Sequence, residues 1–326
     1  MLKKLSLGNF PTKIEPLPKL SAELGKSLYI KRDDQTGTEF SGNKIRKLEY
    51  AVAEALEQGA TTLITCGGIQ SNHCRATAAA AVRLGLKSIL VLRSDEAPKV
   101  EGNYLLDLLL GAEIRLISSQ DYAERLPEIL TDIAAGLPKK GEKGYIMPSG
   151  ASNGVGMLGY FSAFQEITAQ EEAMGIRFDT IVCAAGSGGT YAGLCAANKV
   201  SGKGKDILGV CVGGNAASFV GKCAEIAEES KKYLDLPDLS LTPADIHIVD
   251  GYVGRGYALS TPEELAFIRK VASTEGIVVD PVYTGKTLYG LWHEIKKGNL
   301  PKAKNILFIH TGGLFGLFPK QDEFGL

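Results

Sequence analysis

The sequence has little of what marks a metal-dependent, secreted or membrane-spanning protein. It contains only four histidines, and no two of them are spaced as H-x-x-x-H, so we expect no metal centre. No run approaches 18 consecutive apolar residues, and the first eleven residues lack the apolar stretch of a signal peptide. The six cysteines form no C-x-x-C pair. Reduced, buried thiols in a cytoplasmic protein are therefore expected.

An excess of one charge sign is also missing. The chain carries 36 basic and 37 acidic residues, and its net charge is −1. No basic surplus or recognition module points to nucleic acid, and nothing predicts a membrane partner. The hydrophobic fraction of 44% over 326 residues is enough for a full core and suggests about two domains.

Short apolar runs alternate with helical patterns along most of the chain. Continuous apolar strands separated by helices are typical of parallel sheets covered on both faces, so the pattern predicts an α/β fold. The expected strands are 61–65, 88–92, 112–118, 179–185, 206–212, 246–250, 276–280 and 304–310. Expected helices include 71–85, 101–111, 260–275 and 285–297.

Glycine-rich stretches follow four of these strands. They are "CGGIQSN", "AAGSGGT", "VGGNA" and "HTGG". Ligands bind at the carboxyl ends of parallel strands, so four such turns at one edge predict a shared binding crevice.

Lys44 stands at an unusual place in "EFSGNKIRKLEY", residues 39–50. Apolar spacing predicts a helix beginning there, with Ser41 or Asn43 as its cap. The helix dipole and the nearby cations disfavour an ammonium group at this point, and a lysine with a lowered pKa suits imine chemistry. The alternative is a solvated charged face, with Lys47 and Glu49 at the surface.

The stretch "AAGSGGTYAG" combines a strand end, a glycine loop and a helix start. Its N–H groups would face an anion, and the helix dipole would assist. The last glycine of G-x-G-x-x-G is replaced by Tyr191, which favours a single phosphate over a dinucleotide. A plain tight turn is the alternative.

A different enzyme class competes on motif grounds. "GASNG" matches the nucleophile elbow of serine hydrolases around Ser152, and Asp280 and His310 follow in the order of a triad. Against it, "MPSG" separates the serine from its strand, whereas an elbow turns directly off the strand.

Four longer motifs carry a family resemblance: "KRDDQTGTEFSGNKIRKLEY", "TCGGIQSNHCRATAAAA", "DPVYTGKT" and "FIHTGG". They resemble the D-cysteine desulfhydrase / 1-aminocyclopropane-1-carboxylate deaminase family over nearly the whole chain. The resemblance implies the tryptophan-synthase-β-like fold (fold type II), with two three-layer parallel-sheet domains and pyridoxal 5′-phosphate as cofactor. It implies a small domain at 51–160, a large cofactor-binding domain made of 1–50 and 161–326, and a homodimer.

The resemblance also implies roles for individual residues. Lys44 would hold the cofactor aldehyde and then act as general base or acid. Ser71 would bind the substrate carboxylate and shuttle protons, Asn72 would bond the phenolic oxygen of the cofactor, and His73 would belong to the substrate site. The phosphate would be held by Gly186, Ser187, Gly188, Gly189 and Thr190.

Four further residues complete the implied site. Tyr283 would stand by the ring and the reacting carbon, with Tyr257 close by. Thr284 would sit at the pyridine nitrogen, and Thr311 near a small amino-acid substrate.

The residue at 284 favours one reaction within the family. Ring-opening deaminases resemble "YEGK", whereas this chain has a neutral Thr284 and therefore a weaker electron sink. This suits β-elimination from D-cysteine, which gives pyruvate, ammonia and hydrogen sulfide. L-cysteate sulfo-lyase and 1-aminocyclopropane-1-carboxylate deaminase remain alternatives on the same scaffold. A sulfonate substrate would call for an extra cation, for which Arg255 and His73 are candidates.

Overall fold

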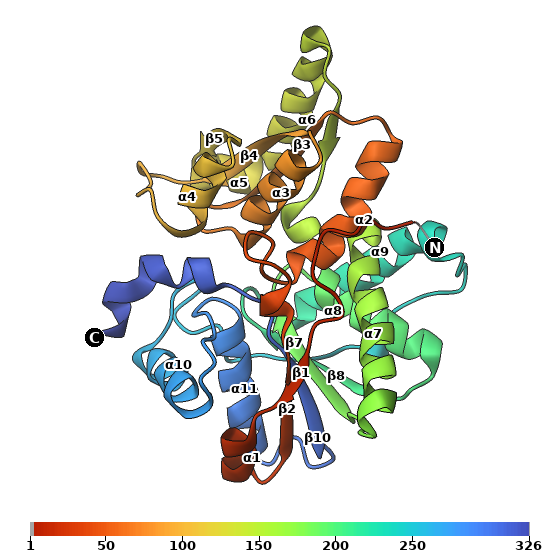
Figure 1. Ribbon diagram of the computed structural model, residues 1–326, viewed down its shortest axis with the longest axis vertical. Helices are drawn as coiled ribbons and strands as arrows, with labels where there is room; N and C mark the ends of the chain where they lie inside the picture. The colour runs from red at the N-terminus through yellow and green to blue at the C-terminus, as the bar shows by residue number, and fades with distance from the viewer. Residues whose placement is uncertain (1–2, 326) are drawn as a thin grey trace.

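The computed structural model describes residues 3–325 and contains two β-sheets, each covered by helices on both faces (Figure 1). The predicted α/β fold with two parallel-sheet, three-layer units is confirmed. The helices are α1 (Pro18–Leu24), α2 (Lys44–Glu57), α3 (Asn72–Arg83), α4 (Gly102–Leu109), α5 (Ser119–Glu124), α6 (Leu126–Gly136), α7 (Gly154–Met174), α8 (Gly189–Ser201), α9 (Ala216–Leu234), α10 (Pro262–Glu275) and α11 (Thr284–Lys296).

The larger sheet has the strand order β1-β2-β10-β7-β8-β9. β1 is antiparallel to β2, and the other neighbouring pairs are parallel. The strands are β1 (Ile14–Pro16), β2 (Ser27–Lys31), β7 (Thr180–Ala185), β8 (Asp206–Cys211), β9 (His247–Val249) and β10 (Asn305–Ile309).

The smaller sheet has the order β5-β4-β3-β6, and all its pairs are parallel. Its strands are β3 (Thr62–Gly68), β4 (Lys87–Arg93), β5 (Glu113–Ile117) and β6 (Gly144–Ile146). In Figure 1 it occupies the upper half of the molecule, and the larger sheet lies below.

Side chains of the central strands alternate between two buried faces. In β7, Ile181 and Cys183 pack toward α7 and α8, whereas Val182 packs toward α10 and α11. Successive side chains of a strand point to opposite faces, so a continuous apolar run is what a sheet covered on both sides requires.

The strand expected at 276–280 is wrong. These residues form no strand in the part of the chain that the structure describes; they connect α10 to α11. Ile277 and Val279 are nevertheless buried in the core between these helices and the sheet. The apolar signal there reflects packing of a connection, not a strand.

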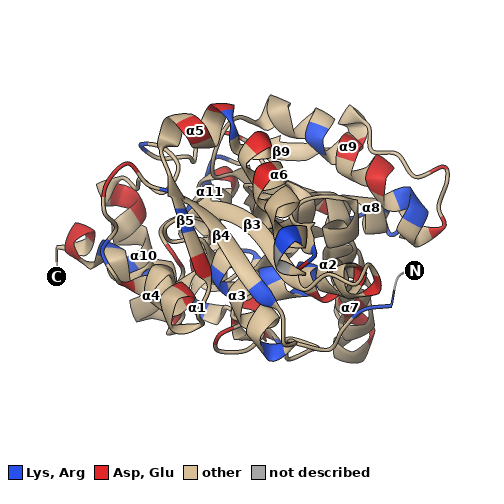
Figure 2. Cartoon of the chain, turned by 90° about the horizontal axis from the view of Figure 1, so that it is seen from above, with Lys and Arg blue, Asp and Glu red and all other residues tan. Residues whose placement is uncertain are grey.

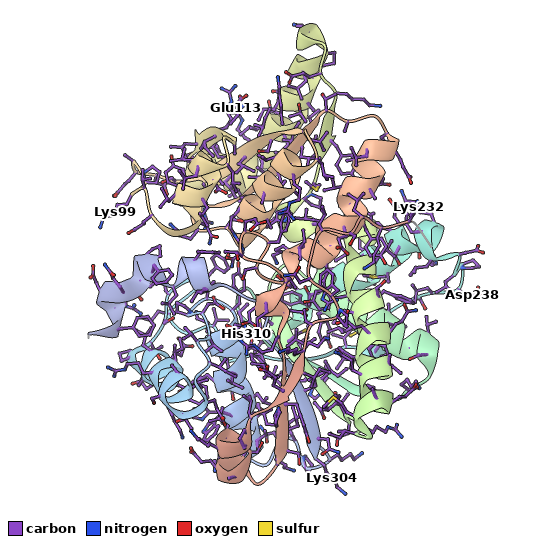
Figure 3. All side chains as sticks on the ribbon, viewed as in Figure 1. Lys99, Glu113, Lys232, Asp238, Lys304 and His310 are labelled. Carbon is purple, nitrogen blue, oxygen red and sulfur yellow. The ribbon has the colours of Figure 1, made fainter. Side chains whose placement is uncertain are left out.

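The carboxyl ends of the strands point toward the middle of the molecule. Lys304, just before β10, lies at the lower end of the view in Figure 3, and His310, just after it, lies near the centre. The glycine-rich turns after β3, β7 and β8 and the turn after β10 line one pocket between the sheets, as the sequence predicts.

The charges show no one-sided distribution. Basic and acidic side chains are interspersed over the chain (Figure 2). Among residues 3–325, no helix is long and apolar enough to cross a membrane, and no three His, Cys, Asp or Glu side chains gather as a metal site would require.

Candidate active site

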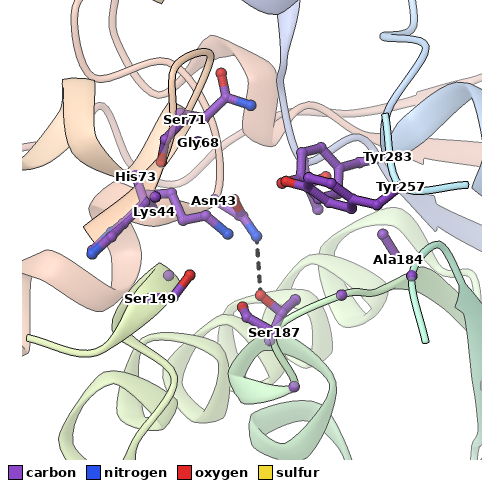
Figure 4. Close-up of a pocket in the computed structure, with 18 of the residues that line it drawn as sticks. Asn43, Lys44, Gly68, Ser71, His73, Ser149, Ala184, Ser187, Tyr257 and Tyr283 are labelled. Atoms are coloured by element: carbon purple, nitrogen blue, oxygen red, sulfur yellow. Dashed lines mark hydrogen bonds between the residues drawn. The ribbon is translucent and has the colours of Figure 1, made fainter. Parts of the chain in front are cut away.

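A pocket of about 430 Å³ lies between the two sheets. Figure 4 shows Lys44 and Ser71 on one side of it, Tyr257 and Tyr283 on the opposite side, and Ser187 below. The lining includes most of the residues expected from sequence: Lys44, Ser71, Asn72, His73, Gly186, Ser187, Gly188, Thr190, Tyr257, Tyr283 and Thr311. Gly189 and Thr284 are not among the lining residues.

Helix α2 begins at Lys44, as predicted, but neither predicted cap acts as one. The Asn43 amide donates instead to Oγ1 of Thr190 at 3.0 Å, and the Ser41 hydroxyl donates to the carbonyl oxygen of Asp34 at 2.9 Å. The start of α2 is thereby tied to the start of α8, which fixes Lys44 relative to the glycine turn.

The Lys44 amine is adapted to react as a free base. Burial lowers its pKa to about 8, and the nearby charge of Asp280 opposes this shift only in part. The predicted direction is confirmed, although burial is the main cause. About a tenth of the amine is then uncharged at pH 7, far more than for an ordinary lysine, and attack on an aldehyde requires the uncharged form.

The glycine turn after β7 forms the start of α8. Gly188, at the cap position, has φ +94°, a conformation that L side chains rarely adopt. The N–H of Gly189 is taken by Oγ of Ser152 at 3.2 Å. Gly189 therefore packs behind the turn, while Gly186, Ser187 and Gly188 face the pocket at the positive end of a helix.

Lys47 is a functional candidate that the sequence reasoning placed wrongly. The alternative of a solvated face at Lys47 and Glu49 is wrong, because their exposures are 0% and 1%. The Lys47 ammonium donates to the carbonyl oxygen of Gly150 at 3.1 Å and to Oγ of Ser152 at 3.2 Å. A Cβ added at Gly189 would lie only 3.0 Å from its nitrogen, so this cation stands directly behind the glycine turn.

No carboxylate balances Lys47 among the described residues. Burial, and then the charges of Lys44 and Lys222, lower its pKa well below the ordinary lysine value. Lys222 lies beside Gly188 at the mouth of the same turn. None of the described lining residues is acidic, so the surroundings favour an anion. The spacing of Lys44 and Lys47, one turn apart on a helix, is the signal that could have identified this second cation.

The turn after β3 presents Ser71, Asn72 and His73. Ser71 caps α3, and its Oγ accepts the N–H of Cys74 at 3.2 Å. The hydroxyl of Thr65 donates to a main-chain carbonyl, so it must accept the proton on Nε2 of His73 at 2.9 Å.

His73 is therefore the tautomer with an unprotonated Nδ1. Burial, and then the charges of Lys44 and Lys47, lower its pKa well below the ordinary value. The suggestion that His73 supplies a cation for a sulfonate is therefore wrong.

Two tyrosines form the opposite wall. The hydroxyl groups of Tyr257 and Tyr283 are hydrogen bonded, and the rings meet edge to face with centroids 6.0 Å apart. Burial, followed by the neighbouring Tyr257, raises the pKa of Tyr283 well above that of an ordinary tyrosine. Both phenols are thus protonated donors near neutral pH.

Thr284 and Thr311 lie in different surroundings. The Thr284 hydroxyl donates to Oδ1 of Asp280 at 2.6 Å and accepts the N–H of Asp280 at 2.8 Å. Thr311 lines the pocket itself. The placement of Thr284 at the pyridine nitrogen stays a prediction.

The structure gives no support to a serine hydrolase. The Ser152 hydroxyl lies 2.7 Å from that of Ser187, and its other partners are Lys47, Gly189 and the carbonyl oxygen of Gly150. Both ring nitrogens of His310 are engaged with the main chain, one with Val278 and one with Gly312. The proposed triad residues are thus committed elsewhere.

Besides Lys44 and Lys222, the pocket has a third cationic side chain, Arg93, which the sequence analysis did not name. It stands at the carboxyl end of β4, and its guanidinium lies 5.5 Å from the centroid of the Tyr122 ring. Arg255, the sequence candidate, is not among the lining residues and donates to the carbonyl oxygen of Ser260.

These features fit pyridoxal phosphate. An amine with lowered pKa suits its aldehyde, and a helix start backed by a buried, unbalanced cation suits its phosphate. The fold and the site together define a pyridoxal-phosphate-dependent enzyme of fold type II.

Comparison with known proteins places the chain in that family. Residues 5–312 match the model described as "Pyridoxal-phosphate dependent enzyme", and the chain belongs to this family. It is 46% identical over 98% of both chains to a putative 1-aminocyclopropane-1-carboxylate deaminase of Thermotoga maritima. It is 43% identical to a bifunctional D-cysteine desulfhydrase/1-aminocyclopropane-1-carboxylate deaminase of Arabidopsis thaliana, covering 98% of this chain and 80% of that one. A solved structure of an ACC deaminase homologue is 41% identical, with a TM-score of 0.91 over 99% of this chain and 95% of that one.

Proposed function

We propose that this enzyme catalyses β-elimination from D-cysteine, with water, to give pyruvate, ammonia and hydrogen sulfide. The observation that carries the proposal is the Lys44 amine, which has a lowered pKa and faces a pocket shared by both sheets. The relatives named for D-cysteine desulfhydrase activity support the substrate.

The cofactor supplies an electron sink that makes loss of the substrate α-proton accessible. Lys44 would hold the cofactor aldehyde, and its free nitrogen would accept the α-proton of the substrate. The glycine turn would hold the phosphate, with the charge of Lys47 behind it. Ser71, at the start of α3, binds the substrate carboxylate at the positive end of that helix.

The tyrosine pair lies across the pocket from Lys44, where the β-substituent leaves. One hydroxyl group of the pair donates to the other, and the remaining O–H hydrogen can be donated to the departing sulfur. Both rings also shield the reacting carbon from water.

Two related reactions compete for the same site. Ring opening of 1-aminocyclopropane-1-carboxylate is supported by the names of similar proteins, but it expels no β leaving group and needs a stronger electron sink. Thr284 carries no charge to provide one. Elimination of sulfite from L-cysteate is favoured by Arg93 at the pocket.

We also propose a homodimer in the cytoplasm, with a small domain at 51–160 and a large domain formed by 1–50 and 161–326. All six cysteines are buried and unpaired, which supports a reducing compartment. The strands of the smaller sheet all fall within 51–160, and the proposed boundaries lie inside α2 and α7.

A screen for pyruvate release tests the proposal. The purified holoenzyme is offered D-cysteine, L-cysteine, L-cysteate, β-chloro-D-alanine and 1-aminocyclopropane-1-carboxylate, with lactate dehydrogenase as the pyruvate detector. We expect D-cysteine to give the highest kcat/KM, with sulfide equal to pyruvate. Ring opening would instead yield 2-oxobutyrate from the cyclopropane substrate, and its dominance would refute the assignment.

A further inference from the structure

The start of α4 clamps the turn that carries Ser71 and Asn72. The main-chain N–H of Asn103 donates to Oε1 of Gln70 at 2.8 Å, and the Gln70 amide donates to the carbonyl oxygen of Glu101 at 3.1 Å. The side-chain nitrogen of Asn103 donates both to the carbonyl oxygen of Gln70 at 3.1 Å and to Oδ1 of Asn72 at 3.0 Å. Asn103 is fully buried, so water does not compete for these bonds.

These contacts decide which end of the Asn72 amide faces the pocket. A main-chain carbonyl only accepts, so the end of Asn103 that meets the carbonyl of Gln70 must be its NH2 group. The same nitrogen meets Asn72, and the atom of Asn72 that it meets must therefore be the oxygen. The NH2 group of Asn72, with two donor hydrogens, is left for the pocket that Asn72 lines.

A second set of contacts fixes the start of α4. Gly102, which precedes Asn103, has φ +57°, and a Cβ there would collide with Oε1 of Gln70 and with the carbonyl oxygen of Phe315. The start of α4 is thus wedged between the turn after β3 and a segment that follows β10. Asn72 is consequently fixed in one orientation rather than free to rotate.

We propose that Asn103 is a positioning residue that presents Asn72 to the cofactor ring as a hydrogen-bond donor. An ionised phenolic oxygen only accepts hydrogen bonds, so a donor stabilises it. Without Asn103, the Asn72 amide could rotate and place its own oxygen against that anion. The proposal rests on the proposed function only in requiring that pyridoxal phosphate occupies this pocket.

The test is the variant Asn103→Asp, which keeps the size of the side chain and, in its ionised form, has no hydrogen to donate. Apo protein is titrated with pyridoxal phosphate by fluorescence quenching, and the absorption spectrum of the bound cofactor is followed against pH. We expect affinity to fall about tenfold, because a hydrogen bond to a charged group is lost. The spectrum should shift toward the form with a protonated phenolic oxygen.

Asn198→Asp is the matched control. Asn198 also makes two hydrogen bonds, to the main chain of Lys205 at 2.8 and 3.0 Å, but it lies in the last turn of α8, remote from the pocket. Its variant should bind the cofactor like the wild type. A similar loss in both variants would mean a general effect on folding and would refute the positioning role.

A double-mutant cycle asks whether Asn103 acts through Asn72. In an Asn72→Ala background, Asn103→Asp should change affinity and spectrum little further. Unchanged binding in the single variant, or an undiminished effect without Asn72, would overturn the proposal. If Asn103→Asp does not fold, Asn103→Ala carries the same test, because its side chain has no hydrogen-bond donor. No readout depends on turnover, so a wild type that binds the cofactor but releases no pyruvate would refute only the proposed function.

Discussion

Helix α2 buries cations in two different surroundings. Arg46 makes a paired contact with Asp33, both bonds 2.8 Å long, and two more bonds with Glu166. One residue further along, Lys47 is equally buried but meets only a carbonyl and a hydroxyl among the described residues.

The ionisation of the two cations differs accordingly. Burial acts to lower the pKa of Arg46, but Asp33 and Glu166 outweigh it and raise the value above normal. Burial lowers the pKa of Lys47, and no carboxylate opposes it. Arg46 is thus balanced within the fold, whereas Lys47 suits an anion that arrives from outside the chain.

The largest effect is expected at Lys44. Lys44→Ala should abolish pyruvate release and the covalent adduct that borohydride reduction traps, because the pocket-lining amine with the lowered pKa is removed. Mass spectrometry of the reduced, digested protein measures the adduct, and circular dichroism should show an intact fold. An adduct that persists in the variant would identify another lysine as the anchor.

Arg46→Met should cost stability rather than catalysis. The buried Asp33 then loses its paired cation and, among the described residues, keeps only the cation of Lys31 nearby, which should cost about 3 kcal/mol of unfolding free energy. Urea denaturation of the apo protein measures this loss. A change within about 1 kcal/mol would show that the ion cluster is not structural.

Lys47→Met should behave in the opposite way. The apo protein should be as stable as the wild type or more so, since an unbalanced buried cation is removed. Affinity for pyridoxal phosphate should fall about tenfold or more, because the positive charge behind the glycine turn no longer attracts the phosphate. Lys222→Met, at an exposed neighbour of the same turn, serves as the control with a smaller loss. A less stable apo protein with unchanged affinity for pyridoxal phosphate would contradict the comparison of Lys47 with Arg46.

The lowered pKa of Lys44 predicts a pH dependence. Only the uncharged amine attacks the aldehyde, so the rate of adduct formation should rise about tenfold per pH unit below 8 and level off above it. Stopped-flow absorbance on mixing apo protein with cofactor measures the profile. A midpoint at about 10.4, the pKa of an ordinary lysine, would contradict the lowered pKa of Lys44.

Arg93→Gln should have the smallest effect. Arg93 is exposed, so its attraction for a sulfonate is screened, and kcat/KM for L-cysteate should fall by about fivefold. The value for D-cysteine should stay within about twofold. Equal losses for both substrates would show that Arg93 does not discriminate the leaving group.

The sheets could be predicted from the sequence, but the surroundings of the charged side chains could not. Seven of the parallel strands coincide with apolar runs in the sequence, and the glycine-rich turns lie at the pocket. The strands β1 and β2 were missed because β1 has only three residues, IEP, and β2 offers only three consecutive apolar residues in SLYIK. Lys47 looked like a surface residue because helical spacing does not reveal that α3 and α7 cover α2 as well.

Hydrogen bonds between residues distant in the chain could likewise not be predicted from the sequence. Asn43 has the residue type and position of a helix cap, yet its side-chain amide donates to Oγ1 of Thr190. Asn103 looks like any polar residue at a helix start, although it decides the orientation of Asn72. Such choices depend on which groups meet after folding, and pattern alone does not contain that information.

The position of β10 has a consequence for biosynthesis. The last strand of the chain pairs with β2 on one side and β7 on the other, so it fills the interior of the larger sheet. While the ribosome still holds residues 305–309, both neighbours expose unpaired main-chain edges that invite association with other nascent chains. A chain truncated before β10 should therefore accumulate in inclusion bodies, even though its smaller sheet is complete.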